Sequence, residues 1–244
     1  MGAEHTSKQF DVELETVRSK VIKMGGLVED QIGRAVRALQ EGDPGLADSV
    51  IAGDDEVNAL EISIDEDCNR IIALRQPEAV DLRFLLATIK TITDLERMGD
   101  EAEKIARMAK SMHASLQANH PEMVNFRQAG TLALAMVGRS LDAFVRLDVG
   151  IAAQVLREDR DLDRVFHGIL RQIVAYSMEG PEGLAPAIEA IFAAKALERI
   201  GDHAKNISEY VIFLVKGKDV RHISMEQVER EVFSGPPPDG RSPG

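Results

Sequence analysis

The sequence has few aromatic residues and no tryptophan: phenylalanine and tyrosine together make up 4% of its 244 residues. A hydrophobic core must therefore consist mainly of Leu, Ile, Val, Ala and Met. Proline is sparse before the C-terminus, and no convincing run alternates between polar and apolar residues as a strand would. Helix-forming residues dominate instead, which predicts an all-helical protein.

Cysteine, long apolar runs and positive charge are also scarce. The single cysteine, Cys68, excludes an intrachain disulfide, favours a reducing cytoplasm and is interpreted as a packed core residue. The N-terminus has no apolar signal-peptide core, and the longest apolar runs are far shorter than the roughly 20 residues that span a bilayer. The net charge of −12 argues against direct binding to nucleic acid or to an anionic membrane. We expect a cytoplasmic protein that reaches a membrane only through partners.

The chain contains an internal repeat. The stretch LERMGDEAEKI (residues 95–105) matches LERIGDHAKNI (residues 197–207) at an offset of 102, and residues 46–58 match residues 151–163 at an offset of 105. Turns at Gln76-Pro77, His120-Pro121 and Gly180-Pro181 divide each half into three helices. We expect six helices, over 10–41, 44–74, 78–115, 122–147, 150–177 and 183–215.

These helices predict two tandem, structurally similar antiparallel three-helix bundles, over residues 8–118 and 121–226. Asp43 and Pro44 form an expected N-cap and first-turn pair. The region around residues 219–222 is expected to leave the second bundle. The tail, 234–244, is rich in proline and glycine and is predicted to be disordered.

Each copy of the repeat carries two carboxylates four residues apart with a glycine between them. They are Glu96 and Asp100 around Gly99, and Glu198 and Asp202 around Gly201. Carboxylates at i and i+4 share a helical face and repel each other, which a bound cation would reverse. A glycine within a helix costs about 1 kcal/mol relative to alanine, so either tight helix packing or close approach of an ion must explain it. A single pair would be ordinary surface; its repetition indicates a metal site.

Further oxygen donors are weaker metal-ligand candidates, and they are Asn58, Glu61, Asp65, Glu103 and Asp163. After Asp163, His167 and Arg171 stand where more carboxylates would be expected, and we interpret both as ordinary surface residues. Ligands that are all oxygen favour hard cations such as Mg, Mn or ferric iron.

Over residues 8–226 the sequence resembles the PhoU family of phosphate-signalling regulators. The resemblance rests on the paired LERMGD and LERIGD motifs and on MGGLVEDQI, RQPEAVDLR and VKGKDVRH. It implies a six-helix, two-bundle protein whose E(D)xxxD motifs hold multinuclear iron or zinc clusters, with Glu96, Asp100, Glu198 and Asp202 as the matching residues.

The resemblance also implies a negative regulator of the phosphate-starvation response and of phosphate uptake, often a homodimer. Such proteins couple the ATPase subunit of a phosphate-specific ABC transporter to a membrane-bound sensor histidine kinase. We expect no enzymatic activity and a location next to the inner membrane through these partners.

Enzymatic functions fit less well. Di-iron enzymes of helical bundles need a Glu-x-x-His motif, which none of the six histidines completes, and no nucleotide-binding glycine loop is present. A carboxylate-bridged metalloenzyme is therefore a weak alternative. A metal-independent helical interaction scaffold is an alternative that the sequence does not separate from a metal-dependent regulator, because acidic faces also receive basic surfaces of partner proteins. His203, beside Asp202, is interpreted as a surface residue rather than a ligand.

Overall fold

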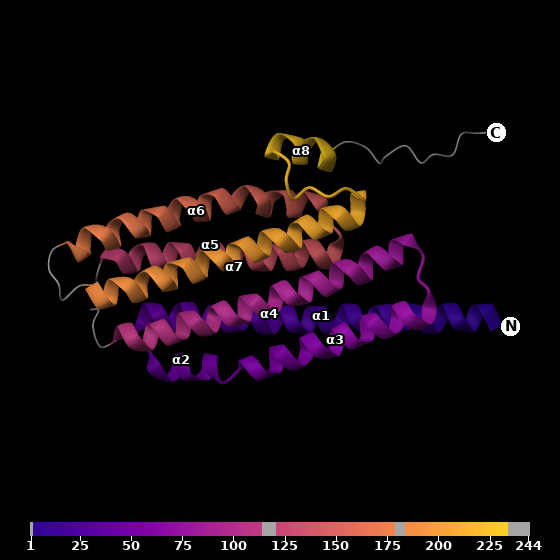
Figure 1. Ribbon diagram of the computed structural model, residues 1–244, viewed down its shortest axis with the longest axis horizontal. Helices are drawn as coiled ribbons and strands as arrows, with labels where there is room; N and C mark the ends of the chain where they lie inside the picture. The colour runs from indigo at the N-terminus through magenta and orange to yellow at the C-terminus, as the bar shows by residue number, and fades with distance from the viewer. Residues whose placement is uncertain (1, 114–120, 179–183, 234–244) are drawn as a thin grey trace.

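The computed structural model describes residues 2–113, 121–178 and 184–233 (Figure 1). Within these ranges the chain forms eight helices and no strand, which confirms the all-helical prediction and corrects the predicted total of six. The helices are α1 (Gly2–Glu41), α2 (Pro44–Ile51), α3 (Asp54–Arg75), α4 (Ala79–His113), α5 (Pro121–Arg146), α6 (Val149–Ser177), α7 (Leu184–Lys216) and α8 (Met225–Phe233). The tail 234–244 lies outside the described residues.

The segment predicted as one helix over 44–74 is broken at Ala52 and Gly53. The Ala52 amide donates to the Asp48 carbonyl at 3.0 Å, and the Gly53 amide donates to the Val50 carbonyl at 3.1 Å, which closes α2. The acidic run 54–56 then opens α3, where the positive end of the helix dipole favours negative charge. This start signal was hidden by an apolar pattern that continues across the break.

The helical pattern predicts no helix beyond residue 215, yet α8 follows the loop 217–224. Ser224 and Gln227 form a capping box: the Ser224 amide donates to the Gln227 side chain at 2.9 Å, and the Gln227 amide donates to the Ser224 hydroxyl at 3.4 Å. Val228 and Val232, four residues apart, are buried. The S-x-x-Q signal was available, but nothing in the first half repeats it.

Two aspartates cap equivalent helices of the two halves. Asp43 accepts backbone hydrogen bonds of 2.9 and 3.0 Å from the first turn of α2, as predicted. Asp148, 105 residues later, accepts bonds of 2.8 and 3.0 Å from the first turn of α6. A residue with positive φ precedes each of them, Gly42 (64°) and Leu147 (53°). The repeat therefore includes the turns between helices.

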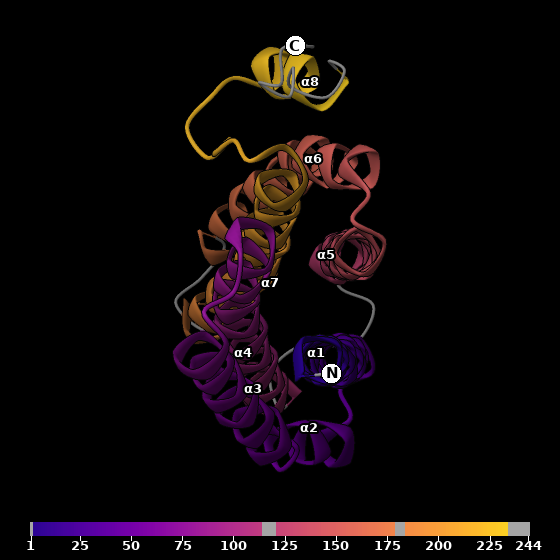
Figure 2. The same cartoon turned by 90° about the vertical axis from the view of Figure 1, so that its right-hand side faces the viewer.

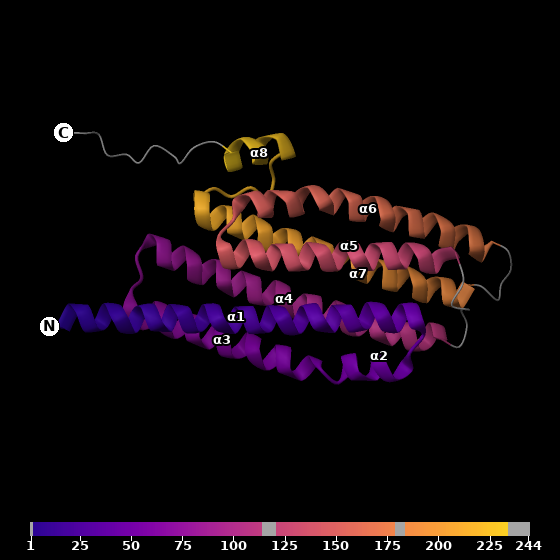
Figure 3. The ribbon, with the colours of Figure 1, turned by 180° about the vertical axis from the view of Figure 1, so that it is seen from behind.

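Helices α1, α3 and α4 pack against one another, and so do α5, α6 and α7 (Figures 1 and 2). Helix α2 packs on α1 and α4, and α8 packs mainly on α6. The halves meet through α4 with α7 and through α1 with α5; the second pair lies in front when the molecule is seen from behind (Figure 3). The buried side chains are mostly Val, Ile, Leu, Ala and Met, as the scarcity of aromatic residues predicts.

The contact between α1 and α5 is antiparallel and lined by glycine. A Cβ added at Gly25 would lie 2.6 Å from Leu141 Cδ2, and one added at Gly130 would lie 2.5 Å from Val36 Cγ1. Shifting each residue number by 105 turns one contact into the other. The same holds for the contacts Gly33 with Leu134 (4.0 Å) and Gly138 with Glu29 (3.2 Å). The halves therefore meet across an approximate twofold relation, and the missing side chains let the two helices approach closely.

Candidate functional site

The first acidic cluster lies between α3 and α4. Its predicted members are all partly buried: Asn58, Glu61 and Asp65 on α3, and Glu96, Asp100 and Glu103 on α4. Burial raises the pKa of Glu61, and the charges of Asp65 and Asp100 raise it further, against a hydrogen bond with Thr93. The structure thus brings carboxylates of the two helices within electrostatic reach of each other. Glu103 is paired along its own helix with Arg107 at 2.5 Å.

The second cluster lies between α6 and α7 and includes a carboxylate that sequence reasoning missed. Asp163 lies on α6, and Glu198 and Asp202 lie on α7. Burial raises the pKa of Asp202, and the charges of Glu198 and Asp159 raise it further. Burial, Asp159 and Glu198 likewise raise the pKa of Asp163. The spacing of Asp159 and Asp163, four residues apart as in the repeated motif, was the signal that could have found Asp159.

Two lysines of α7 already neutralise part of the second cluster. Lys205 Nζ lies 2.6 Å from Asp159 Oδ2, and Lys195 Nζ lies 2.5 Å from Glu198 Oε2. Asp159 is only 6% exposed, so water screens its pair with Lys205 poorly. A metal ion entering this cluster would compete with two ammonium groups of the same chain.

Gly201 is helical, and another helix of the same half passes close to it. A Cβ added at Gly201 would collide with Leu162 Cδ2 on α6 and would lie 3.5 Å from Met136 Cε on α5. Both side chains are buried. Tight apolar packing therefore accounts for this glycine without an ion. Gly99 is helical and buried as well.

The contact between α4 and α7 contains a buried polar network. Asp94 of α4 accepts hydrogen bonds from His203 Nδ1 at 2.6 Å and from Asn206 Nδ2 at 3.0 Å, both on α7. Burial raises the pKa of Tyr210, as do the charge of Asp94 and a hydrogen bond with it. The interpretation of His203 as a surface residue is wrong: it is 8% exposed, because it lies on the face of α7 that packs on α4.

A second polar contact crosses the same pair of helices. Glu101 is 2% exposed and pairs with Arg199 of α7 at 3.1 Å and with Lys104 of α4 at 3.0 Å. Glu101 and His203 each follow the GD of their motif, and each is paired with the opposite half. The repeated motif thus joins the halves through the residue after its aspartate.

Glu209 lies on α7, one turn after Asn206. It lines a groove of about 450 Å³ that Asp202, Arg221 and His222 also line. It is 7% exposed. Burial raises the pKa of Glu209 to about 7, because Lys205 and Arg221 only partly offset the loss of water. The native state therefore holds a proton that the unfolded chain, with a pKa near 4.5, releases.

The contribution of Glu209 to the free energy of unfolding consequently falls as pH rises from 4.5 through 7, because native Glu209 keeps its proton to a higher pH than unfolded Glu209 does. We expect Glu209→Gln to raise the free energy of unfolding at pH 8 by about 1–3 kcal/mol and to leave it unchanged near pH 4.5. Urea denaturation from pH 4.5 to 8.5 measures this. Parallel pH profiles for the parent and the variant would contradict it.

Residues 21–109 and 126–211 match the PhoU domain. The phosphate-specific transport system accessory protein PhoU homolog of Pseudomonas aeruginosa is 46% identical over 229 residues, which cover 93% of this chain and 94% of the relative. The phosphate-specific transport system accessory protein PhoU of Escherichia coli K12 is 42% identical over 226 residues, 93% of each chain.

Two crystal structures share the fold. PhoU from Pseudomonas aeruginosa has a TM-score of 0.83 at 45% identity, covering 86% of this chain and 100% of that one. The phosphate transport system regulatory protein PhoU from Streptococcus pneumoniae has a TM-score of 0.78 at 28% identity, covering 86% and 99%. These relatives are accessory and regulatory proteins rather than enzymes. In sequence and in fold, the chain belongs to the PhoU family.

Proposed function

We propose that this protein is the regulatory accessory protein of a phosphate-specific transport system and that it represses the phosphate-starvation response and phosphate uptake. The observation that carries the proposal is the 46% identity to the accessory protein of Pseudomonas aeruginosa over nearly the whole of both chains. In this role it couples the ATPase subunit of the transporter to a membrane-bound sensor histidine kinase.

The proposal places the protein in the cytoplasm, beside the inner membrane through these partners, as a homodimer. None of the described helices is both long and apolar enough to cross a bilayer. We further propose that residues 8–118 and 121–226 act as two similar PhoU-like bundles. Support comes from the two separate matches to the domain and from the contacts that repeat at an offset of 105.

Deleting the gene tests the regulatory role. We expect genes for phosphate scavenging to be expressed in phosphate-rich medium as strongly as in starved cells, because the repressing signal is lost. A reporter for such a gene measures this, and the parent gene supplied in trans should restore repression. A reporter that stays silent in the deletion strain would overturn the proposal.

We also propose that the two acidic clusters hold metal ions, as iron or zinc clusters or as Mg or Mn. Across the described residues, no three His, Cys, Asp or Glu side chains converge as a metal ion requires, so ligation needs side chains to reorient. The donor chemistry fits: carboxylates gather from two helices, and their repulsion helps to raise the pKa of Glu61, Asp163 and Asp202. A bound cation would supply the positive charge that relieves this repulsion.

The variant Glu198→Gln/Asp202→Asn is expected to lose metal from the second cluster while keeping or gaining stability without metal, because it removes two of four repelling carboxylates. Elemental analysis of untagged protein and thermal melts with and without chelator measure both effects. Asp11→Asn/Glu15→Gln is the matched control, since these acids are also four residues apart but exposed on α1. Full metal occupancy in the first variant would contradict the assignment.

A metal-independent interaction scaffold is the second candidate function, favoured by Lys195 and Lys205, which neutralise part of the second cluster without a metal. Repression by the metal-free double variant in the deletion strain would support this candidate over a metal-dependent regulator.

A further inference from the structure

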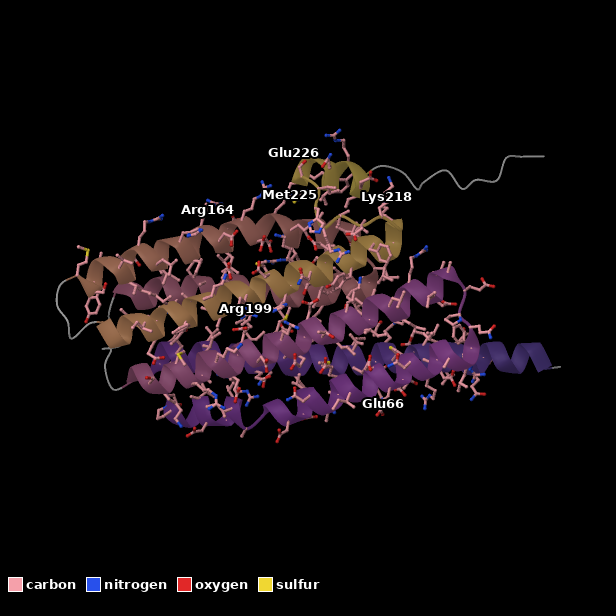
Figure 4. All side chains as sticks on the ribbon, in the orientation of Figure 1. Glu66, Arg164, Arg199, Lys218, Met225 and Glu226 are labelled. Carbon is pink, nitrogen blue, oxygen red and sulfur yellow. The ribbon has the colours of Figure 1, made fainter. Side chains whose placement is uncertain are left out.

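The outer face of α6 carries a row of cationic side chains. Its members, hereafter the arginine row, recur at intervals of three and four residues and are all exposed: Arg157, Arg160, Arg164, His167 and Arg171. This spacing places them on one helical face. Figure 4 shows Arg164 projecting from the edge of the molecule on the side where α8 lies. Four arginines on one face stand out in a chain whose net charge is −12.

The row is not a consequence of the repeated fold. At an offset of 105, the first half carries Ala52, Asp55, Ala59, Ile62 and Glu66. These residues are exposed too, so the same surface exists in both halves. Only the second half is basic here, so the repeated fold does not account for the positive charge on α6.

Helix α8 packs against one end of the row. Arg157 Nε pairs with Glu229 Oε1 at 2.8 Å. One turn away, a hydrogen bond with Ser224 lowers the pKa of Glu226, and the charge of Arg160 lowers it further. Glu226 and Glu229 are three residues apart, as are Arg157 and Arg160. The later glutamate meets the earlier arginine, so the two helices run antiparallel here. Carboxylates of an antiparallel helix thus match the spacing of the row.

The apolar side chains of α8 complete this contact. Val228 and Val232 of α8 are buried, and α8 packs mainly on α6. On α6, Ala153 lies one turn before Arg157 on the same face and is fully buried. The helix that packs against this end of the row, α8, is therefore acidic and amphipathic.

The row continues past α8. Arg164 pairs with Asp161 of its own helix, and Arg171 forms no ion pair or hydrogen bond with the described residues. The same face then becomes apolar at Val174, which is 54% exposed, and at Met178, which is 82% exposed. A groove of about 530 Å³ between α5 and α6 runs alongside, with Arg164 in its wall. Beyond α8, this face therefore offers positive charge together with exposed apolar side chains.

We propose that Arg164, His167, Arg171, Val174 and Met178 dock an acidic amphipathic helix of a partner protein, placed beyond α8 on the same face of α6. The inference rests on the proposed function in one respect, that an accessory protein acts by binding partners. The combination of carboxylate spacing and apolar contact, already present where α8 meets α6, identifies a helix as the occupant. Its carboxylates stand three, four or seven residues apart.

The test uses a fluorescent peptide of about 20 residues, long enough to be helical, that repeats the Glu and Val spacing of α8. Fluorescence anisotropy measures its binding to the full-length protein at low and high salt. We expect the variant Arg164→Glu/Arg171→Glu to bind about tenfold more weakly or worse, and high salt to weaken binding to the parent. A peptide with lysine in place of glutamate should prefer this variant.

Arg37→Glu/Arg70→Glu is the matched control, because it makes the same charge change on exposed residues of α1 and α3. Arg70 also pairs with an aspartate three residues earlier, as Arg164 does. The control should bind like the parent, and both variants should melt like it. Equal binding by the two variants would overturn the proposal.

Two further outcomes would also overturn it in favour of another occupant. Row-dependent binding to phosphatidylglycerol vesicles without peptide binding would assign the face to a membrane. Self-association abolished by Arg164→Glu/Arg171→Glu would assign it to a second copy of the chain. The gene-deletion phenotype is measured independently of all these results, so failure of this inference is distinguishable from failure of the proposed function.

Discussion

Replacing Asp94 by leucine is expected to lower the free energy of unfolding by about 3–5 kcal/mol. Asp94 is 6% exposed and accepts hydrogen bonds from His203 and Asn206, and Tyr210 bonds to it as well. Without the carboxylate, buried His203 and the partly buried Asn206 and Tyr210 of α7 would lose their partner. The penalty is therefore that of unsatisfied donors inside the contact between the halves, not of one lost ion pair.

Urea denaturation of the parent and of Asp94→Leu measures this effect. Adding His203→Leu should cost less in the Asp94→Leu background than in the parent, because the two side chains share one interaction. Asp142→Leu is the control, since Asp142 is exposed on α5 and should change stability little. If Asp94→Leu were no more destabilising than Asp142→Leu, the network would not hold the halves together.

The double variant Gly25→Leu/Gly130→Leu should also lose much stability. New side chains would enter positions where a Cβ alone lies 2.6 Å from Leu141 and 2.5 Å from Val36. Overpacking of this kind costs about 1–3 kcal/mol per site. For a chain of this size, each kcal/mol lowers the melting temperature by about 2–4 °C.

Gly26→Leu provides an adjacent control. A Cβ at Gly26 would meet no atom within 4 Å, so leucine there should raise stability by up to about 1 kcal/mol through helix propensity. Opposite shifts in melting temperature at neighbouring positions would separate helix propensity from packing between the halves. Two shifts in the same direction would contradict the close approach of α1 and α5.

The helical fold could be predicted from sequence because apolar spacing and turn residues act locally. Asp43, for example, caps the helix that its own neighbours form. The break at Gly53 was missed because two apolar faces happen to continue in phase across it. Helix α8 was missed because its apolar side chains, Val228 and Val232, rely on α6 for burial, and the sequence does not show where α6 lies.

The candidate site was predictable where the motif repeats and not where it depends on the opposite helix. The spacing of Glu198 and Asp202 predicted a shared face, but the partners of that face come from other helices. The spacing of Asp159 and Asp163 was a signal on α6 alone, and only the packing of α6 against α7 shows that it brings Asp159 near Asp202. His203 has the sequence neighbours of a surface residue, because its partner Asp94 is 109 residues away in the chain.

The antiparallel contact between α1 and α5 makes this single polypeptide resemble a homodimer. The first half contains Gly25 and Val36, so it already carries both surfaces of the contact and could pair with a copy of itself. Tandem linkage satisfies these surfaces within one chain and fixes the stoichiometry at one to one. It also frees each half to diverge, and the halves do differ at the same place in the motif, where one carries Glu101 and the other His203. By the same geometry, two chains could trade halves and keep every contact between α1 and α5 intact.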